Sequence, residues 1–250
     1  MGRTLVIVAL AAGLLVGVVA VAGADTLVGT DAAETLNGTS RPDQLYAEAG
    51  NDTVLGFAGN DYVEGGSGAD RLEGGPGLDL LIGGTGPDRA DAGIGNDVVY
   101  AGADDDLVLG GLGADTLFGQ AGTDRLFGGP GRDRLYASDG NDVADGGSGA
   151  DRIVSDAGNA TLMGGSGRDV LLATGGNATV NGGSSSDRIR TGAGADRVIG
   201  GSGRDGIATG AGNDNVNVRD GNRDRVRCGS GQDTVIADDG DLLRGCETEQ

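Results

Sequence analysis

An aspartate that returns every ninth residue constrains this chain more than any other feature of its sequence. Stepping by nine from Asp25 to Asp214 gives 22 register positions, of which nineteen hold aspartate; the exceptions are Glu34, Ala160 and Ala178. Glycine stands two residues before the register position in 18 of the 22 cases, and an apolar residue stands two residues after it in all 22. Three columns kept in phase over this length predict a repeat architecture, in which each repeat packs against its neighbours.

The nine residues read Gly-Gly-x-Gly-x-Asp-x-apolar-x, which combines a tight loop with a short strand. Glycine adopts the positive φ of a tight loop at little steric cost, and x-apolar-x fits a strand whose central side chain points inward. With 54 Gly and only 3% aromatic residues, an ordinary globular core is excluded. Two nonapeptides complete a coil with two loops and two strands. We therefore predict an all-β fold: a parallel β-roll, or β-solenoid, with 18 residues per coil.

Complete copies of the motif stand at Gly65–Leu72 and Gly110–Leu117. The motif resembles the RTX, or haemolysin-type, calcium-binding nonapeptide repeat. The resemblance extends from Asp25 to Asp214, with a variant continuation to the end of the chain. It implies several Ca²⁺ ions bound between stacked loops. Because it covers the repeats alone, it does not imply the activity of a cytolysin, protease or lipase.

The residue types also fit calcium without the resemblance. Calcium takes about six to eight oxygen ligands, which loop carbonyls and aspartate carboxylates can supply. The alternative is that these aspartates only cap turns, yet neither Asn nor Ser replaces them at any register position. Stacked carboxylates about 5 Å apart also repel one another without a counter-ion. The predicted calcium ligands are Asp43, Asp52, Asp61, Asp70, Asp79, Asp88, Asp97, Asp106, Asp115, Asp124, Asp133, Asp142, Asp151, Asp169, Asp187, Asp196, Asp205 and Asp214.

Alternate repeats fall on opposite edges of an 18-residue coil. The edge that begins with Asp25 has aspartate at all eleven of its register positions, whereas the edge that begins with Glu34 has it at eight of eleven. We expect an unbroken calcium ladder on the first edge. On the second edge we expect an interruption around Ala160 and Ala178.

Charge and residue types narrow the classes of function. The net charge is −20, and all 18 basic residues are arginine, so we expect neither a nucleic-acid nor a membrane-surface partner. Without His or Lys, acid–base catalysis would fall to Asp, Glu or Tyr, and the nine-residue regularity assigns the carboxylates to metal. We predict that the protein is not an enzyme. A polysaccharide-degrading β-solenoid enzyme stays as a remote alternative.

Both ends of the chain carry export features. Arg3, the apolar run 5–21 and Ala22-Gly23-Ala24 fit a secretory signal peptide over residues 1–24. Residues 25–214 then form the calcium-binding β-roll, and residues 215–250 form variant last coils and a cap. Cys228 and Cys246 stand one coil apart, within disulfide reach, and an exported chain favours a bridge between them. We expect a secreted, extracellular protein with no membrane insertion after signal cleavage.

One predicted strand face is rich in apolar side chains and is a candidate contact surface for self-association or an unknown partner. Its residues are Leu80, Ile82, Tyr100, Phe118, Tyr136, Val154 and Leu172. We expect a calcium-binding repeat protein that folds on calcium and has a structural, cell-surface or adhesive role. An ice- or carbohydrate-binding face on the same scaffold is the alternative, although the outward positions show no regular Thr ladder.

Overall fold

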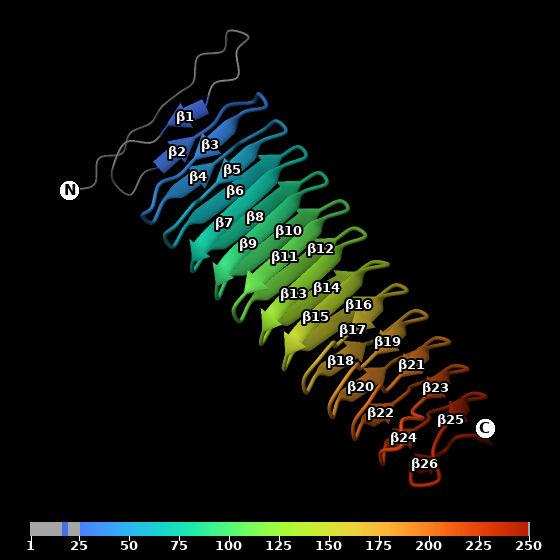
Figure 1. The fold of residues 1–250 in the computed structure, drawn as a ribbon. Coiled ribbons are helices and arrows are strands. Elements are labelled where there is room, and N and C mark those ends of the chain that lie inside the picture. Colours follow the sequence, from blue (N-terminus) through green and yellow to red (C-terminus); the bar gives the residue numbers. More distant parts are fainter. Residues whose placement is uncertain (1–16, 20–25, 250) are drawn as a thin grey trace. The chain divides into compact units, whose positions relative to one another are not determined.

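The computed structural model describes residues 17–19 and 26–249, which form strands, turns and bends without a helix. The chain divides into two compact units, Met1–Arg125 and Leu126–Gln250. In both, the strands form two parallel sheets, one of odd-numbered strands (the odd sheet) and one of even-numbered strands (the even sheet) (Figure 1). Each unit is therefore the parallel β-solenoid that the nine-residue repeat predicts.

In the first unit the odd sheet has the order β1-β3-β5-β7-β9-β11 and the even sheet the order β2-β4-β6-β8-β10-β12. Its strands are β1 (Gly17–Val19), β2 (Thr26–Val28), β3 (Thr35–Asn37), β4 (Gln44–Tyr46), β5 (Thr53–Leu55), β6 (Tyr62–Ser67), β7 (Arg71–Gly77), β8 (Leu80–Thr85), β9 (Arg89–Gly95), β10 (Val98–Ala103), β11 (Leu107–Leu112) and β12 (Thr116–Ala121). Strand β1, inside the predicted signal peptide, pairs with β3. The rest of that segment lies outside the described residues.

In the second unit the orders are β13-β15-β17-β19-β21-β23-β25-β27 and β14-β16-β18-β20-β22-β24-β26. The strands are β13 (Arg125–Gly131), β14 (Arg134–Asp139), β15 (Val143–Gly149), β16 (Arg152–Ala157), β17 (Thr161–Met163), β18 (Val170–Ala173), β19 (Thr179–Asn181), β20 (Arg188–Thr191), β21 (Arg197–Ile199), β22 (Gly206–Ala208), β23 (Asn215–Asn217), β24 (Arg225–Arg227), β25 (Thr234–Ile236), β26 (Leu242–Arg244) and β27 (Thr248–Glu249).

The strand register follows the 18-residue coil. Leu72 pairs with Ala90, and Ala90 with Val108. The spacing changes near the end of the second unit, where Gly206 pairs with Arg225 because one extra residue enters the preceding loop. The shift agrees with the slip of the aspartate register after Asp214.

The core of each unit is the column of apolar residues two places after the register position. These side chains, such as Leu72, Leu81 and Val99 in the first unit, are fully buried. Their neighbours on either side face outward, which gives the burial alternation along each strand. The two sheets thus enclose this column, joined on some strands by a second small buried residue such as Ala92 or Ala101, and the loops between the sheets carry the aspartates.

Candidate metal centre

The register aspartates form hydrogen-bonded ladders along the loops. In each rung the backbone N–H of one aspartate donates to Oδ1 of the aspartate one coil later. The Asp61 N–H donates to Asp79 Oδ1 at 2.8 Å, and the Asp79 N–H donates to Asp97 Oδ1 at 2.8 Å. These side chains are buried, with Asp79 3% and Asp97 1% exposed. One carboxylate oxygen therefore joins consecutive coils, which differs from a local turn cap because donor and acceptor are 18 residues apart.

The second carboxylate oxygen has no such partner. Oδ2 is buried without a hydrogen-bond partner in many rungs of the described ladders, where a charged oxygen without a partner is costly. These rungs are Asp52, Asp61, Asp70, Asp79, Asp88, Asp97, Asp106, Asp151, Asp169, Asp187, Asp196, Asp205, Asp214, Asp224 and Asp233. A turn cap needs only one oxygen, so hydrogen bonding alone leaves half of each carboxylate unexplained.

Glycine five residues before the aspartate opens the space that Oδ2 faces. A Cβ placed on Gly74 would lie 2.7 Å from Asp79 Oδ2 and 2.6 Å from the carbonyl oxygen of Ala92, one coil later. Gly146 repeats the arrangement, with Asp151 Oδ2 at 2.6 Å and the Gly164 carbonyl oxygen at 2.8 Å from its Cβ position. A carboxylate oxygen and a carbonyl oxygen from adjacent coils thus converge beside these glycines. Alanine takes the same position before Asp52, Asp97 and Asp106.

The raised pKa values of the buried aspartates also favour a bound cation. Burial raises the pKa of Asp79 to about 7, against the lowering effect of the hydrogen bond from Asp61, and the charges of Asp97 and Asp61 raise it further. Burial likewise raises the pKa of Asp88 to about 7 and that of Asp151 to about 6. An ionised ladder is therefore unfavourable unless a cation neutralises it.

The donor set fits a hard cation that accepts backbone oxygens. Within the described ranges, no group of three or more His, Cys, Asp or Glu side chains converges on one point, which excludes an all-side-chain site there. Calcium takes carboxylate and carbonyl oxygens together. The orphaned Oδ2 atoms and the converging carbonyls supply both kinds.

Comparison with known proteins agrees with this geometry. A family model described as the RTX calcium-binding nonapeptide repeat matches twelve overlapping segments that together run from residue 28 to residue 223. The chain belongs to this family. It is a calcium-binding repeat protein, and the resemblance noted from the motif is confirmed.

Among solved structures, the RTX chain is similar to a hyperactive, Ca²⁺-dependent, beta-helical antifreeze protein from an Antarctic bacterium. The two share 22% sequence identity with a TM-score of 0.47, over 84% of this chain and 80% of that one. No curated protein matches the chain.

None of the described residues forms a helix that is long and apolar enough to cross a membrane.

All eighteen predicted ligands of the RTX repeats lie on the two loop edges, and all are buried. On the second edge, Ala160 and Ala178 carry no side-chain oxygen for the rung, although the Ala178 N–H still donates to Asp196 Oδ1 at 2.8 Å. The interrupted calcium ladder stays a prediction. A row of asparagines one position earlier continues past this gap. The Asn177 N–H donates to Asn159 Oδ1 at 2.8 Å, and the Asn159 N–H to Asn141 Oδ1 at 2.9 Å. This asparagine row was not predicted, although the sequence shows these asparagines directly before their register positions.

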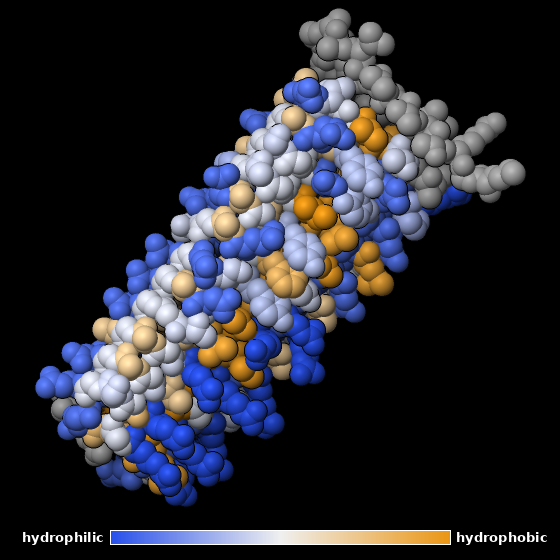
Figure 2. All heavy atoms as spheres, turned by 180° about the vertical axis from the view of Figure 1, so that it is seen from behind, coloured by the Kyte–Doolittle hydropathy of each residue, from blue (hydrophilic) through white to orange (hydrophobic). Residues whose placement is uncertain are grey.

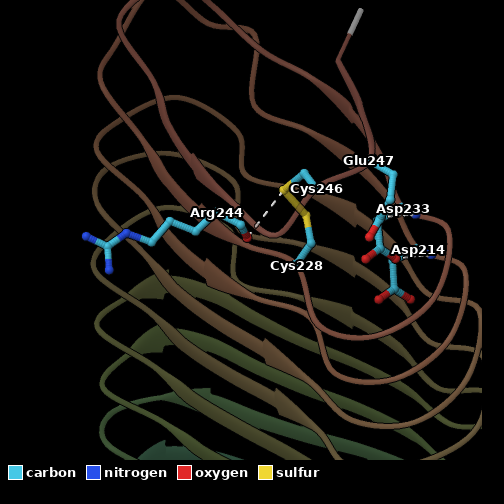
Figure 3. Close-up of a disulfide and its surroundings, with 6 residues drawn as sticks. All are labelled: Asp214, Cys228, Asp233, Arg244, Cys246 and Glu247. Carbon is cyan, nitrogen blue, oxygen red and sulfur yellow. Dashed lines mark hydrogen bonds between the residues drawn. A yellow bond between two sulfur atoms is a disulfide. The ribbon is translucent and has the colours of Figure 1, made fainter.

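The ladders also extend beyond the predicted ligand set. The Asp205 N–H donates to Asp224 Oδ1 at 2.7 Å, and the Asp214 N–H donates to Asp233 Oδ1 at 2.9 Å. Counting strictly by nine misses Asp224 and Asp233, because the register slips by one residue after Asp214. The Asp233 N–H then donates to Glu247 Oε2, so a glutamate ends the second ladder (Figure 3).

The predicted disulfide is present. Cys228 and Cys246 are bonded, with their Cα atoms 5.2 Å apart. Cys228 lies one residue after β24 and Cys246 two residues after β26, so the bridge joins adjacent coils at the carboxyl-terminal end of the second unit (Figure 3).

The predicted contact face lies outward on the even sheets of the two units. In the first unit, Leu80 and Ile82 lie on β8, and Tyr100 stacks on Phe118 with ring centroids 4.7 Å apart. Tyr136, Val154 and Leu172 occupy corresponding positions on β14, β16 and β18 of the second unit. Figure 2 looks onto the even sheets and shows these apolar and aromatic side chains.

Proposed function

We propose that this protein is a secreted calcium-binding repeat protein that folds on calcium and acts as a structural or adhesive element outside the cell. The supporting observation is the set of buried Oδ2 atoms without a partner, since a cation between coils neutralises them. Metal binding then becomes folding free energy, because an unfolded chain holds no such site. Calcium outside the cell would fold a chain that stays unfolded where calcium is scarce.

Circular dichroism during a calcium titration tests this proposal. At neutral pH, the chain in chelator is expected to lack most of its β-structure and to gain it cooperatively as calcium is added. Magnesium at the same concentration is the control, because it prefers smaller octahedral sites and keeps its waters. Full β-structure in chelator, with no response to calcium, would contradict the proposal.

Secretion rests on the predicted signal peptide and on the disulfide, which persists in oxidising compartments. Cleavage between Ala24 and Asp25 would remove β1 and leave β3 with its amino-terminal neighbour absent. Mass spectrometry of the exported chain is expected to give Asp25 as the first residue. An exported chain that retains residues 1–24 would contradict this assignment.

The outward aromatic pair supports a contact role for the even sheet of the first unit. We assign Tyr100, Phe118 and their apolar neighbours to self-association with a second copy, because Tyr100 is 36% exposed although its ring is stacked. Replacing Tyr100 and Phe118 by Ser is expected to lower the oligomeric state measured by light scattering in calcium. An unchanged state would rule this surface out.

A further inference from the structure

Arginines gather on one face of the second unit, although the chain as a whole carries a net charge of −20. On β14, β16, β18, β20, β22, β24 and β26, the outward positions include seven arginines, and the exposed acidic residues of these strands are Asp139 on β14 and Asp156 on β16. From β18 to β26 the outward positions hold five arginines and no acidic residue. We call this set the arginine face: Arg134, Arg152, Arg188, Arg190, Arg225, Arg227 and Arg244. The outward positions of the odd-sheet strands β15 to β25 hold a single arginine, Arg197. The basic charge is thus sorted to one sheet.

A trough divides the arginine face. On β22 the outward residues are Gly206 and Ala208, which have almost no side chain. Strand register places Gly206 between Arg188 and Arg225, and Ala208 between Arg190 and Arg227. The two arginine rows stand two strand spacings apart, or about 10 Å. Four guanidinium groups therefore border a trough floored by glycine and alanine.

Two hollows mark this trough. One, of about 780 Å³, is lined by Arg190, Ala208 and Arg227 among other residues. The other, of about 700 Å³, is lined by Arg168, Arg204 and Arg223 at its loop edge. Figure 2 shows the strongly hydrophilic side chains crowded at the carboxyl-terminal end of this sheet.

The arginines that border the trough have no ion pair among those that the described residues form. The ion pairs of the described residues join Arg71 to Glu73 and Arg89 to Asp91, both in the first unit. The four arginines that border the trough are exposed. The carboxylates beneath them, Asp187 and Asp205 in the ladder, are buried with Oδ1 turned to a backbone N–H of the preceding coil. Like charges held together at an exposed trough favour an anionic ligand.

We propose that the arginine face binds an acidic polysaccharide, whose carboxylate or sulfate groups are held by Arg188, Arg190, Arg225 and Arg227. A guanidinium group binds such oxyanions through two parallel hydrogen bonds, which a lysine ammonium cannot do. The open trough accommodates an extended polymer, and the apolar side chains of Val170, Leu172 and Leu242 beside it can pack against sugar rings.

Nucleic acid fits the same face less well. Binding of single strands relies on bases stacked on aromatic side chains, and β20, β22, β24 and β26 carry none at their outward positions. A duplex is read by an element inserted into its groove, whereas this surface is a shallow trough. This inference goes beyond the proposed calcium function, and calcium enters its test only to keep the chain folded.

The test measures binding by the full chain in saturating calcium, with dextran sulfate and hyaluronate as acidic probes. Neutral dextran is the uncharged reference, and single-stranded DNA represents the competing class of ligand. The quadruple variant Arg188→Gln, Arg190→Gln, Arg225→Gln and Arg227→Gln is expected to lose at least tenfold in affinity for both acidic polymers. The matched control replaces four arginines elsewhere, Arg71, Arg89, Arg125 and Arg197, by Gln and changes net charge equally. It is expected to bind as the parent chain does.

Four outcomes would overturn the proposal. The quadruple variant and its control could lose affinity equally, or the parent chain could bind neither acidic polymer. The parent chain could also bind neutral dextran as tightly as the acidic polymers, or bind single-stranded DNA more tightly through the same arginines. If the quadruple variant does not fold by circular dichroism, Ala208→Glu replaces it, since this places one carboxylate in the trough and leaves every arginine intact. It is expected to weaken binding of both acidic polymers at least threefold, and unchanged affinity would again refute the inference.

Discussion

Replacing Asp79 by Asn or by Ala separates the two roles of a ladder carboxylate. Asp79 Oδ1 accepts the Asp61 N–H at 2.8 Å, whereas Oδ2 faces the space beside Gly74 with no hydrogen-bond partner. Asparagine keeps the first oxygen and removes the charge, while alanine removes both oxygens. Hydrogen bonding and calcium binding therefore predict different orders of stability for these variants.

The magnitudes follow from these contacts. In Asp79→Ala the buried Asp61 N–H loses its acceptor, which costs about 1–3 kcal/mol in unfolding free energy with or without calcium. In Asp79→Asn that hydrogen bond stays, and the new Nδ2 faces the region of the Ala92 carbonyl oxygen, so the calcium-free chain is expected to be as stable as the parent. With calcium at one hundred times its dissociation constant, loss of one bound ion removes about 2.7 kcal/mol.

The assay is urea unfolding followed by circular dichroism, in chelator at acidic pH and in saturating calcium at neutral pH, with ion stoichiometry from calorimetry. Asp91→Asn is the matched control, because it removes the same charge from an exposed position on β9. In calcium we expect the order parent, then Asp79→Asn, then Asp79→Ala; in chelator only Asp79→Ala falls. Parent stoichiometry and stability for Asp79→Asn in calcium would refute the assignment of Oδ2 to metal.

Three further outcomes are expected. Burial raises the pKa of Asp79 and Asp88 from 3.8 to about 7, so protonation of these carboxyl groups favours the folded chain. The free energy of unfolding without calcium should therefore be greatest at and below about pH 4 and should fall as pH rises toward about 7. A flat pH profile in chelator would contradict this expectation. Ala178→Asp should raise the number of bound calcium ions in calorimetry, since it adds a carboxylate at the gap, and an unchanged number would show that the gap is not set by this position. Replacing Cys228 and Cys246 by Ser should destabilise the last coils by about 3 kcal/mol and speed their hydrogen exchange, and reductant should then have no further effect.

The repeat predicted the backbone almost completely, because a nine-residue period leaves one way to bury the apolar column. The coil length, the buried aspartates and the disulfide all follow from it. The aspartate register slips by one residue after Asp214 and resumes at Asp224 and Asp233, but the predicted ligand set stops at Asp214 and leaves out these two residues, which belong to the ladders. Strand pairing places them, because it follows the chain past the loop that absorbs the inserted residue.

The two uses of the carboxylate could not be separated from the sequence. The sequence offers calcium binding and turn capping as alternatives. In the rung at Asp79, Oδ1 accepts the backbone N–H of Asp61, while Oδ2 lies beside Gly74 without a hydrogen-bond partner. The distinction depends on atoms of adjacent coils, eighteen residues apart. The asparagine row Asn141, Asn159 and Asn177 was missed for the same reason, because its hydrogen bonds join coils.

The net charge of the chain does not describe how charge is distributed over its surface. A total of −20 argues against anionic partners only if the charges are evenly spread, and the coil prevents that. Carboxylates of the register turn into the loops, where they accept hydrogen bonds from backbone N–H groups, while positions on either side of the apolar residue face solvent. Arg188 and Arg225 are far apart in sequence but stand two strands apart in one sheet. Local charge in a solenoid is therefore set column by column, so a strongly acidic chain can gather arginines on one face.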